Sequence, residues 1–181
     1  CTSPHAYTDL ADGPHTFEVR ATDQAGNVDA TPASHSWTID TVAPAAPVIS
    51  APADESVTND STPTISGTAE AGSTVTVRDG VTVLGTATAD GSGNWTFTPG
   101  APLPDGAQSF SATATDAAGN VSAQSNVVTI NIDTAAPTTT LTSTPPVNDP
   151  SNDPSFGFES NEGAATFECR LDAGAWGPCT S

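Results

Sequence analysis

Apolar and polar residues alternate in steps of two along several short segments of the chain. This alternation places successive side chains on opposite faces of a β-strand, and the segments are rich in threonine and valine, which favour strands. Glycine, proline, asparagine and aspartate separate the segments and predict turns. Nowhere do apolar residues recur with the period of a helix. The pattern predicts an all-β chain, with strands in residues 63–68, 74–78, 81–86, 95–98, 110–115 and 128–132.

The chain contains an internal repeat with a spacing of 93 residues. The motif Ala-Thr-Asp-x-Ala-Gly-Asn-Val occupies residues 21–28 and occurs again in residues 114–121. Asp-Thr-x-Ala-Pro occupies residues 40–44 and again residues 133–137. Because this second motif marks each junction, residues 41–133 are expected to form a complete unit.

Both ends of the chain look like parts of a second kind of unit. The sequence of residues 167–172 roughly matches that of residues 75–79, so residues 134–181 resemble the first half of a unit. Residues 1–40 resemble the second half. Cys-Thr-Ser both opens and closes the chain, and joining the end to the start in register gives a period of 178 residues. We interpret the sequence as one period of an alternating two-domain array, cut inside one domain.

About seven short strands in roughly 93 residues are typical of an immunoglobulin-like sandwich. The predicted fold class is therefore all-β, with tandem immunoglobulin-like β-sandwiches. Residues 1–40 are predicted to be the C-terminal half of one domain, residues 41–133 a complete domain, and residues 134–181 the N-terminal half of a domain. The inward-facing strand positions predict a core of Ile65, Val75, Val77, Val83, Trp95, Phe97, Phe110, Ala112, Val128, Ile130 and Ile132.

Three motifs of the complete unit resemble the bacterial Ig-like repeats of giant surface adhesins. They are Thr-Pro-Thr-Ile-Ser-Gly-Thr-Ala at 62–69, Gly-x-Trp-Thr-Phe-Thr at 93–98 and the motif at 114–121. The flanking halves resemble a related repeat of bacterial surface proteins. The resemblance implies a non-enzymatic structural repeat segment of a long extracellular bacterial fibre or adhesin stalk, at the cell surface, that provides reach and stiffness.

Two other functions are compatible with such a sandwich: a ligand- or glycan-binding Ig-like module, and an accessory domain of a secreted enzyme. An exposed aromatic or apolar patch on the loops at one pole would favour the first. Loops 99–106 and 161–164 carry small and acidic residues instead. A neighbouring enzyme domain in the flanking sequence would favour the second, whereas further copies of the repeat would favour the stalk.

The charge of the chain excludes several classes of partner. Three arginines, no lysine and 21 acidic residues give a formal net charge of −18 at pH 7. A nucleic-acid-binding protein needs lysine and arginine to neutralise phosphates, and so does a protein that binds anionic membranes. The sequence has no run of 18 apolar residues, so it does not predict a membrane span. We expect the sequence to be an excerpt of a longer protein.

The cysteines are interpreted through the repeat. Cys169 lies in a predicted strand and Cys179 follows ten residues later, after a hairpin turn, so the two can form a disulfide. In the array, Cys1 is the equivalent of Cys179 on the preceding copy, and its partner would be Cys169 of that copy. The alternative is that these thiols are free and buried. A disulfide implies an oxidising, extracellular setting.

Several carboxylates are expected to converge at the domain junctions. Strand polarity brings the turn at 116–120 and the loop carrying Glu70 near the linker. The set expected at the first junction is Asp12, Asp40, Glu70 and Asp116. The set expected at the second is Asp105, Asp133 and Glu162, with Asp23 from the next copy.

Calcium is the cofactor that such a set would hold, because Ca²⁺ takes 6–8 oxygen ligands. The resemblance strengthens this interpretation, since adhesins with such repeats resemble cadherins in using linker calcium for rigidity. The alternative is turn chemistry with solubilising charge: Asp-x-Ala-Gly-Asn is also a good turn, in which the aspartate bonds to the backbone and the Gly-Asn pair takes positive φ.

The sequence gives little support for a catalytic site or a zinc site. His5, His15 and His35 lack the ligand spacing of a zinc site, and no nucleophile elbow accompanies the many serines. Two of the three tryptophans match inward-facing strand positions, so core packing is favoured over sugar stacking. The expected partners are neighbouring copies of the same repeat, head to tail, either covalently continuous or joined by sandwich complementation.

Overall fold

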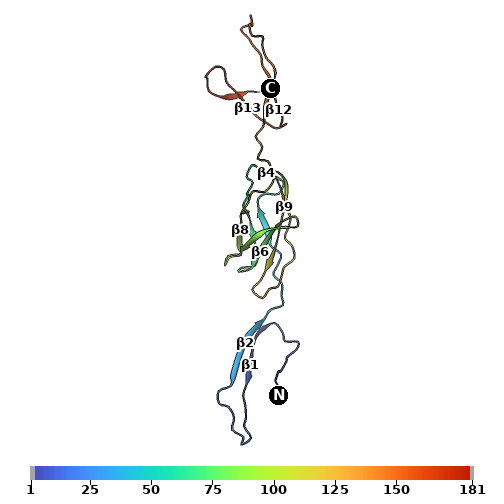
Figure 1. Ribbon diagram of the computed structural model, residues 1–181, viewed down its shortest axis with the longest axis vertical. Helices are drawn as coiled ribbons and strands as arrows, with labels where there is room; N and C mark the ends of the chain where they lie inside the picture. The colour runs from blue at the N-terminus through green and yellow to red at the C-terminus, as the bar shows by residue number, and fades with distance from the viewer. Residues whose placement is uncertain (1–2, 180–181) are drawn as a thin grey trace. The chain divides into compact units, whose positions relative to one another are not determined.

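The computed structural model describes residues 3–179, and every regular element in this range is a β-strand (Figure 1). The chain folds into two compact units, Cys1–Asp133 and Thr134–Ser181. Over the described residues, no helix is long and apolar enough to cross a membrane. The all-β prediction is confirmed, while the division into one complete domain and two halves stays a prediction.

Two facing sheets form the middle domain of the first unit. One sheet has the order β4-β10-β9-β6-β7, in which β4 runs parallel to β10 and all other neighbours are antiparallel. Its strands are β4 (Ser56–Thr58), β6 (Thr74–Asp79), β7 (Thr82–Thr88), β9 (Gly106–Thr115) and β10 (Val128–Ile132). The other sheet is antiparallel, in the order β3-β5-β8: β3 (Val48–Ala51), β5 (Ile65–Thr68) and β8 (Asn94–Phe97).

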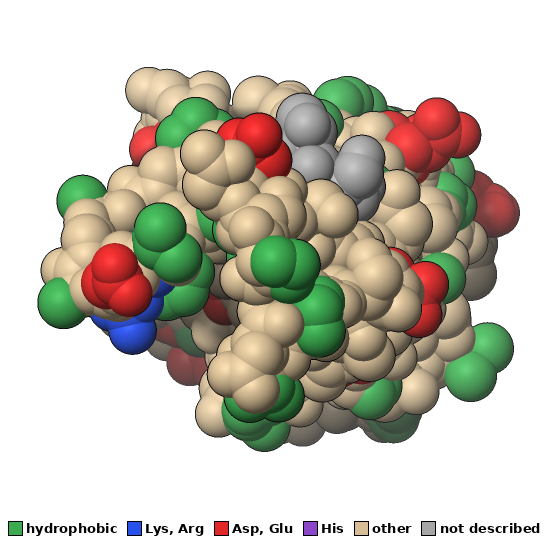
Figure 2. All heavy atoms as spheres, turned by 90° about the horizontal axis from the view of Figure 1, so that it is seen from above, with side chains coloured by type: hydrophobic (Ala, Val, Ile, Leu, Met, Phe, Trp, Pro, Cys, Tyr) green, Lys and Arg blue, Asp and Glu red, His purple; other side chains and the backbone are tan. Residues whose placement is uncertain are grey.

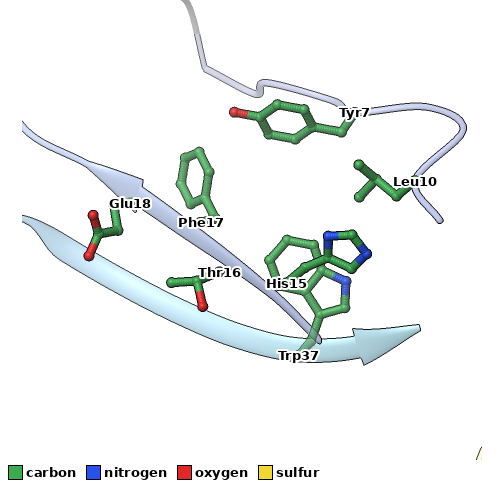
Figure 3. A pocket seen from close by; sticks show the side chains of 7 residues that line it. All are labelled: Tyr7, Leu10, His15, Thr16, Phe17, Glu18 and Trp37. Carbon is green, nitrogen blue, oxygen red and sulfur yellow. The ribbon is translucent and has the colours of Figure 1, made fainter. Parts of the chain in front are cut away.

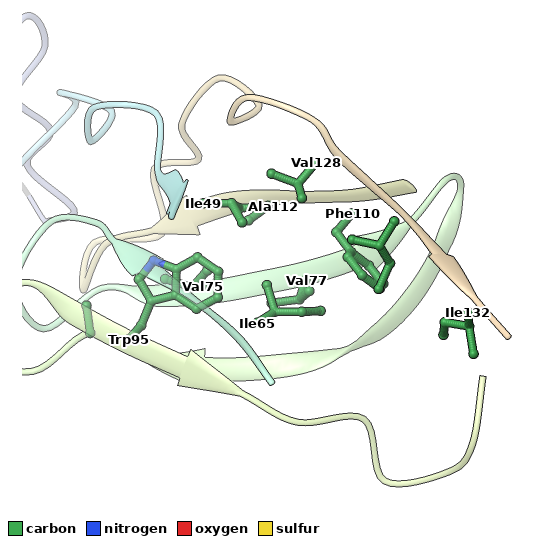
Figure 4. Packing of buried hydrophobic residues seen from close by; sticks show 11 residues of the cluster. Ile49, Ile65, Val75, Val77, Trp95, Phe110, Ala112, Val128 and Ile132 are labelled. Atoms are coloured by element: carbon green, nitrogen blue, oxygen red, sulfur yellow. The ribbon is translucent and has the colours of Figure 1, made fainter. Parts of the chain in front are cut away.

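Alternating side chains of both sheets fill the space between them (Figure 4). Nine of the eleven predicted core residues are buried, and Phe97 packs against the cluster while partly buried. The prediction for Val83 was wrong, because Val83 is 50% exposed. It lies on edge strand β7 beside a register shift, where Arg78 pairs with Val83 but Val77 pairs with Gly85. Such a bulge reverses the faces that simple alternation predicts.

One glycine inside a strand explains how closely the backbones approach in the smaller sheet. A Cβ atom on Gly67 would collide with the carbonyl oxygen of Val48 and would also meet the Trp95 ring. Glycine in a strand interior often marks such an approach. Close packing of the backbone therefore requires glycine at position 67 of the motif at 62–69.

A separate hairpin precedes the middle domain in the first unit. It consists of β1 (Gly13–Val19) and β2 (Ala33–Ile39), paired from Gly13↔Ile39 to Val19↔Ala33. The hairpin β9–β10 has the same register 93 residues later, with Gly106 opposite Ile132. The isolated bridge Thr22↔Val28 likewise recurs as Thr115↔Val121. The repeat seen in the sequence is thus a repeat of strand pairing.

The second unit contains two small hairpins. They are β11 (Thr139–Ser143) with β12 (Gly157–Ser160), and β13 (Phe167–Cys169) with β14 (Gly177–Cys179). Cys169 and Cys179 form the disulfide that the sequence predicts, and Cys1 lies outside the described residues. The Phe158 and Phe167 rings meet edge to face at 4.8 Å between centroids, which joins the two hairpins.

The register of β13–β14 repeats that of β6–β7. Phe167 pairs with Cys179 and Cys169 with Gly177, as Val75 pairs with Ala87 and Val77 with Gly85 at positions 92 residues earlier. The hairpin β13–β14 of the second unit therefore has the strand pairing of β6–β7 in the middle domain. The hairpin β1–β2 has the strand pairing of β9–β10, at the end of that domain.

Candidate functional site

One type of turn occurs three times in the first unit, in residues 23–27, 90–94 and 116–120. Each has aspartate first and asparagine fifth, and the aspartate N–H donates to the asparagine carbonyl at 2.8–3.1 Å. The fourth residue is a glycine with φ between 82° and 96°. One aspartate oxygen accepts two or three backbone N–H bonds of 2.8–2.9 Å. The sequence offered this turn, as the alternative to calcium, for the motif Asp-x-Ala-Gly-Asn, and the aspartate bonding is confirmed. The expected positive φ holds for the glycine but not for the asparagine. The same bonding at 90–94, where serine replaces the alanine, was not predicted.

These bonds lower the pKa of all three aspartates below the ordinary value of 3.8. For Asp23 and Asp116 the largest cause is the hydrogen bond from the side-chain amide of Asn27 or Asn120. For Asp90 it is the backbone N–H of Asn94. Donors that point at a carboxylate favour its charged form, so each turn holds its own aspartate ionised.

The turn at 116–120 is tied to the linker that enters the middle domain. The Asn120 Nδ2 donates both to the Oδ2 atom of Asp116, at 2.8 Å, and to the carbonyl oxygen of Asp40, at 3.0 Å. The Thr41 hydroxyl donates to both carboxylate oxygens of Asp12, at 2.9 and 3.0 Å. The Val42 N–H donates to the Asp40 carboxylate at 3.0 Å. We call the set of residues joined by these bonds the linker network: Asp12, Asp40, Thr41, Val42, Asp116 and Asn120.

The structure brings together most of the first predicted set of carboxylates, but not as a metal cluster. Asp12, Asp40 and Asp116 belong to the linker network, and the loop carrying Glu70 lies at the same end, because Thr74 pairs with Thr115. Among the described residues, no three histidine, cysteine, aspartate or glutamate side chains form a group that could hold a metal ion.

The hydrogen bonds indicate what these carboxylates do in this chain. Both oxygens of Asp12 and both of Asp116 accept bonds from neighbouring residues, which is the geometry of linker and turn bonding. Calcium at this junction stays a prediction. The second predicted set, Asp105, Asp133 and Glu162 with Asp23 of another copy, spans two units and two copies and stays a prediction.

The histidines of the first unit pack against an aromatic ring. The rings of His15 and His35 stack on Trp37 at 5.6 and 6.1 Å between centroids, and Figure 3 shows His15 beside Trp37. The His15 Nε2 atom also bonds to the carbonyl oxygen of Ala11 at 2.7 Å. Trp37, Tyr7 and Phe17 line a small hollow of about 170 Å³ on this hairpin.

The second unit has a comparable apolar hollow of about 250 Å³. Phe158 and Cys169 line it from two different hairpins, and Trp176, which is 59% exposed, lies at the same hollow. The Arg170 guanidinium lies 4.6 Å from the centroid of the Trp176 ring. Of the three tryptophans, only Trp95 is buried, so the expectation of core packing holds fully at that position alone.

Acidic side chains are dispersed over the face shown in Figure 2. On the face shown in Figure 2, carboxylates stand singly among hydrophobic and other side chains, and little basic charge is visible. With a net charge of −18 and three arginines, the chain offers little positive charge to a polyanion.

Comparison with known proteins finds a family match for the middle domain. Residues 49–134 match the family model of the bacterial Ig-like domain. A solved biofilm-associated protein, BSP domain, is 30% identical over 70% of this chain, with a TM-score of 0.39. A tetra-tandem repeat in the extending region of a large adhesion protein is 25% identical over 75%, with a TM-score of 0.42. The chain spans 20% and 35% of those two chains. No curated protein sequence matches it.

Proposed function

We propose that the chain is a non-catalytic structural segment of a long extracellular fibre or adhesin stalk, on the ground that residues 49–134 match the bacterial Ig-like domain family. One observation carries the proposal: the hairpin β1–β2 has the register of β9–β10, displaced by 93 residues. A sequence that repeats its strand pairing at a fixed spacing builds length by adding units.

The middle domain is suited to be a spacer because the chain enters and leaves it at opposite ends. Asp40 is bonded to Asn120, beyond the last residue of β9, whereas Asp133 follows Ile132, which pairs with the first residue of β9. The ten residues of β9 separate the two ends by roughly 30 Å, at about 3.3 Å per residue. Tension along the array is thus transmitted through the length of the sandwich.

The linker network supports stiffness at the entry to the domain. Thr41, Asp40 and Asn120 each make a hydrogen bond that ties the linker to its neighbours, and Pro44 restricts φ soon afterwards. The disulfide of the second unit supports an oxidising, extracellular location. We expect the segment to serve reach and orientation, with any binding function carried by other parts of the protein.

Covalent concatemers of one, two and four copies test this proposal by small-angle X-ray scattering. A stiff spacer with two modules per copy should gain at least about 65 Å in maximum dimension with each copy, from one strand of about ten residues per module at about 3.3 Å per residue, with the linkers adding to this length. Matched concatemers with Pro44 and Pro137 replaced by glycine should gain less. A four-copy chain with the dimensions of a compact particle would contradict the proposal.

A further inference from the structure

We propose that residues 134–181 of one copy bind the hairpin β1–β2 of a second copy, with β13 pairing antiparallel to β1. The interface completes one immunoglobulin-like sandwich from two copies. This inference rests on the proposed function, and it names the partner, the strands and the register of the contact.

Two unpaired strand edges point to this contact. In the described residues β1 is hydrogen-bonded to β2 alone, and β13 to β14 alone. In the middle domain, the strand equivalent to β1 is β9, which lies between β10 and β6. The strand equivalent to β13 is β6. The free edge of β1 and the free edge of β13 are thus the two edges that pair in the complete domain, and an open edge is a template for strand addition.

The register of β6 with β9 predicts which residues meet. Val77 pairs with Ala112 in the middle domain. Residues of β13 lie 92 positions after their equivalents in β6, and residues of β1 lie 93 positions before theirs in β9. The equivalent of the pair Val77–Ala112 is therefore Cys169 opposite Val19, with both side chains on the inner face of the sandwich. On the outer face, the same register places Glu168 opposite Arg20 and Arg170 opposite Glu18.

The charges at these positions are complementary. The whole chain has three arginines, and two of them fall opposite a glutamate in this register. Glu18, Arg20, Glu168 and Arg170 are all exposed within their own units. The equivalent pairs in the middle domain are Thr76 with Thr113 and Arg78 with Ser111, which carry no opposite charges. Cross-strand pairs of opposite charge stabilise a sheet, and a register shift of one residue would remove both pairs.

The inner faces are apolar and only partly covered in the separate units, where Tyr7 lies against Phe17. Phe110 is fully buried in the middle domain, whereas its equivalent Phe17 is only half-buried and Val19 is 43% exposed. The register places Phe17 opposite Leu171, as Phe110 lies opposite Asp79, and Leu171 lines the apolar hollow beside Phe158 and Cys169. Asp40 and Asp133 lie at opposite ends of the middle domain, so the proposal takes the partner from a second copy.

Paired charge reversals on the full chain test the register without changing its net charge. One variant carries Glu168→Arg with Arg170→Glu, and the other carries Glu18→Arg with Arg20→Glu. Each variant opposes like charges when it pairs with itself. In an equimolar mixture the two variants can alternate. The reversed β13 of the first variant then meets the reversed β1 of the second, and the native β13 of the second meets the native β1 of the first, so every contact pairs opposite charges.

Sedimentation equilibrium of the oxidised chain, from micromolar to about 1 mM, measures the outcome. We expect the natural chain to self-associate, each variant alone to bind about tenfold more weakly or worse, and the mixture to recover the natural affinity. A control with Arg78→Glu and Glu159→Arg reverses two charges outside the interface and should associate like the natural chain. Strictly monomeric behaviour of the natural chain would overturn the proposal, and so would unchanged association of both variants.

This result is separable from the test of the spacer function. Concatemers that extend with copy number while the free chain stays monomeric would leave the spacer in place and remove the interface between copies. Association of the free chain in the predicted register, combined with compact concatemers, would support the interface between copies and remove the spacer function.

Discussion

The hairpins β1–β2 and β9–β10 share a register but not an environment. In β9–β10, the side chains of Phe110, Val128 and Ile130 are at most 4% exposed. Their equivalents Phe17, His35 and Trp37 are exposed or half-buried. The backbone pairing of a hairpin is therefore encoded locally, by its turn and its alternation, whereas burial depends on the sheet that covers it. The same local sequence can build a core in one place and an accessible face in another.

The largest expected effect distinguishes the two environments. Phe110→Ala should destabilise the middle domain by about 3–5 kcal/mol, because it leaves a cavity in a packed core. Phe17→Ala should leave the melting temperature of the middle domain unchanged in dilute solution. Circular dichroism melting measures both. Equal effects of the two substitutions would show that β1–β2 is as well covered as β9–β10.

Reduction of the disulfide probes the second pair of equivalent hairpins. Opening the link between Cys169 and Cys179 should destabilise the second unit by about 2–3 kcal/mol, from the entropy of a short closed loop. Strands β6 and β7 have no disulfide and should keep their amide protection. Hydrogen exchange before and after reduction measures the two regions in one sample. Loss of protection in β6–β7 would mean that the units do not unfold independently.

The asparagines of the equivalent turns should differ in their importance. Asn120→Ala removes the donor to Asp116 and to the Asp40 carbonyl, and should cost about 1 kcal/mol of middle-domain stability. Asn27→Ala removes the equivalent bond to Asp23 and should leave the middle domain unaffected. Chemical denaturation followed by Trp95 fluorescence, in a background with Trp37→Phe and Trp176→Phe, reports on the middle domain. If both variants shift the midpoint equally, the linker contact of Asn120 contributes nothing.

Acid should weaken the turns in a defined direction. The pKa of Asp116 is lower in the folded chain than in the unfolded chain. Its contribution to stability is therefore complete above the unfolded pKa of about 3.9 and is lost as the pH falls through the folded pKa. Melting temperatures between pH 6 and pH 2.5 should fall less steeply for Asp116→Asn than for the natural chain. Parallel curves would contradict the assignment.

Chelation should have the smallest effect on the middle domain. The Asp116 carboxylate is satisfied by its own turn, so a chelator should leave the melting temperature of that domain unchanged. Titration of calcium back into the chelated chain is the converse measurement. A calcium-dependent rise in melting temperature, absent in Asp40→Asn, would establish the junction as a metal site.

Sequence alternation predicted the fold because most strands keep a strict period of two. It failed at Val83, where a bulge on edge strand β7 changes the face, and a bulge leaves no mark in a hydrophobic pattern. Strand polarity predicted that the turn at 116–120 lies near Asp40, and the structure confirms this contact. The bridging role of Asn120 was not predictable, because it depends on one amide reaching two acceptors from different parts of the chain.

The parallel pairing of β4 with β10 determines how the middle domain meets a pulling force. Ser56, Val57 and Thr58 lie opposite Ile130, Asn131 and Ile132, and the Asp133 N–H donates to the Thr58 carbonyl. Force applied through the two linkers draws these parallel strands in opposite directions along their length. Their hydrogen bonds are then sheared together instead of being opened one after another. The domain is thus braced, at the strand through which the chain leaves it, against the kind of load that a tether carries.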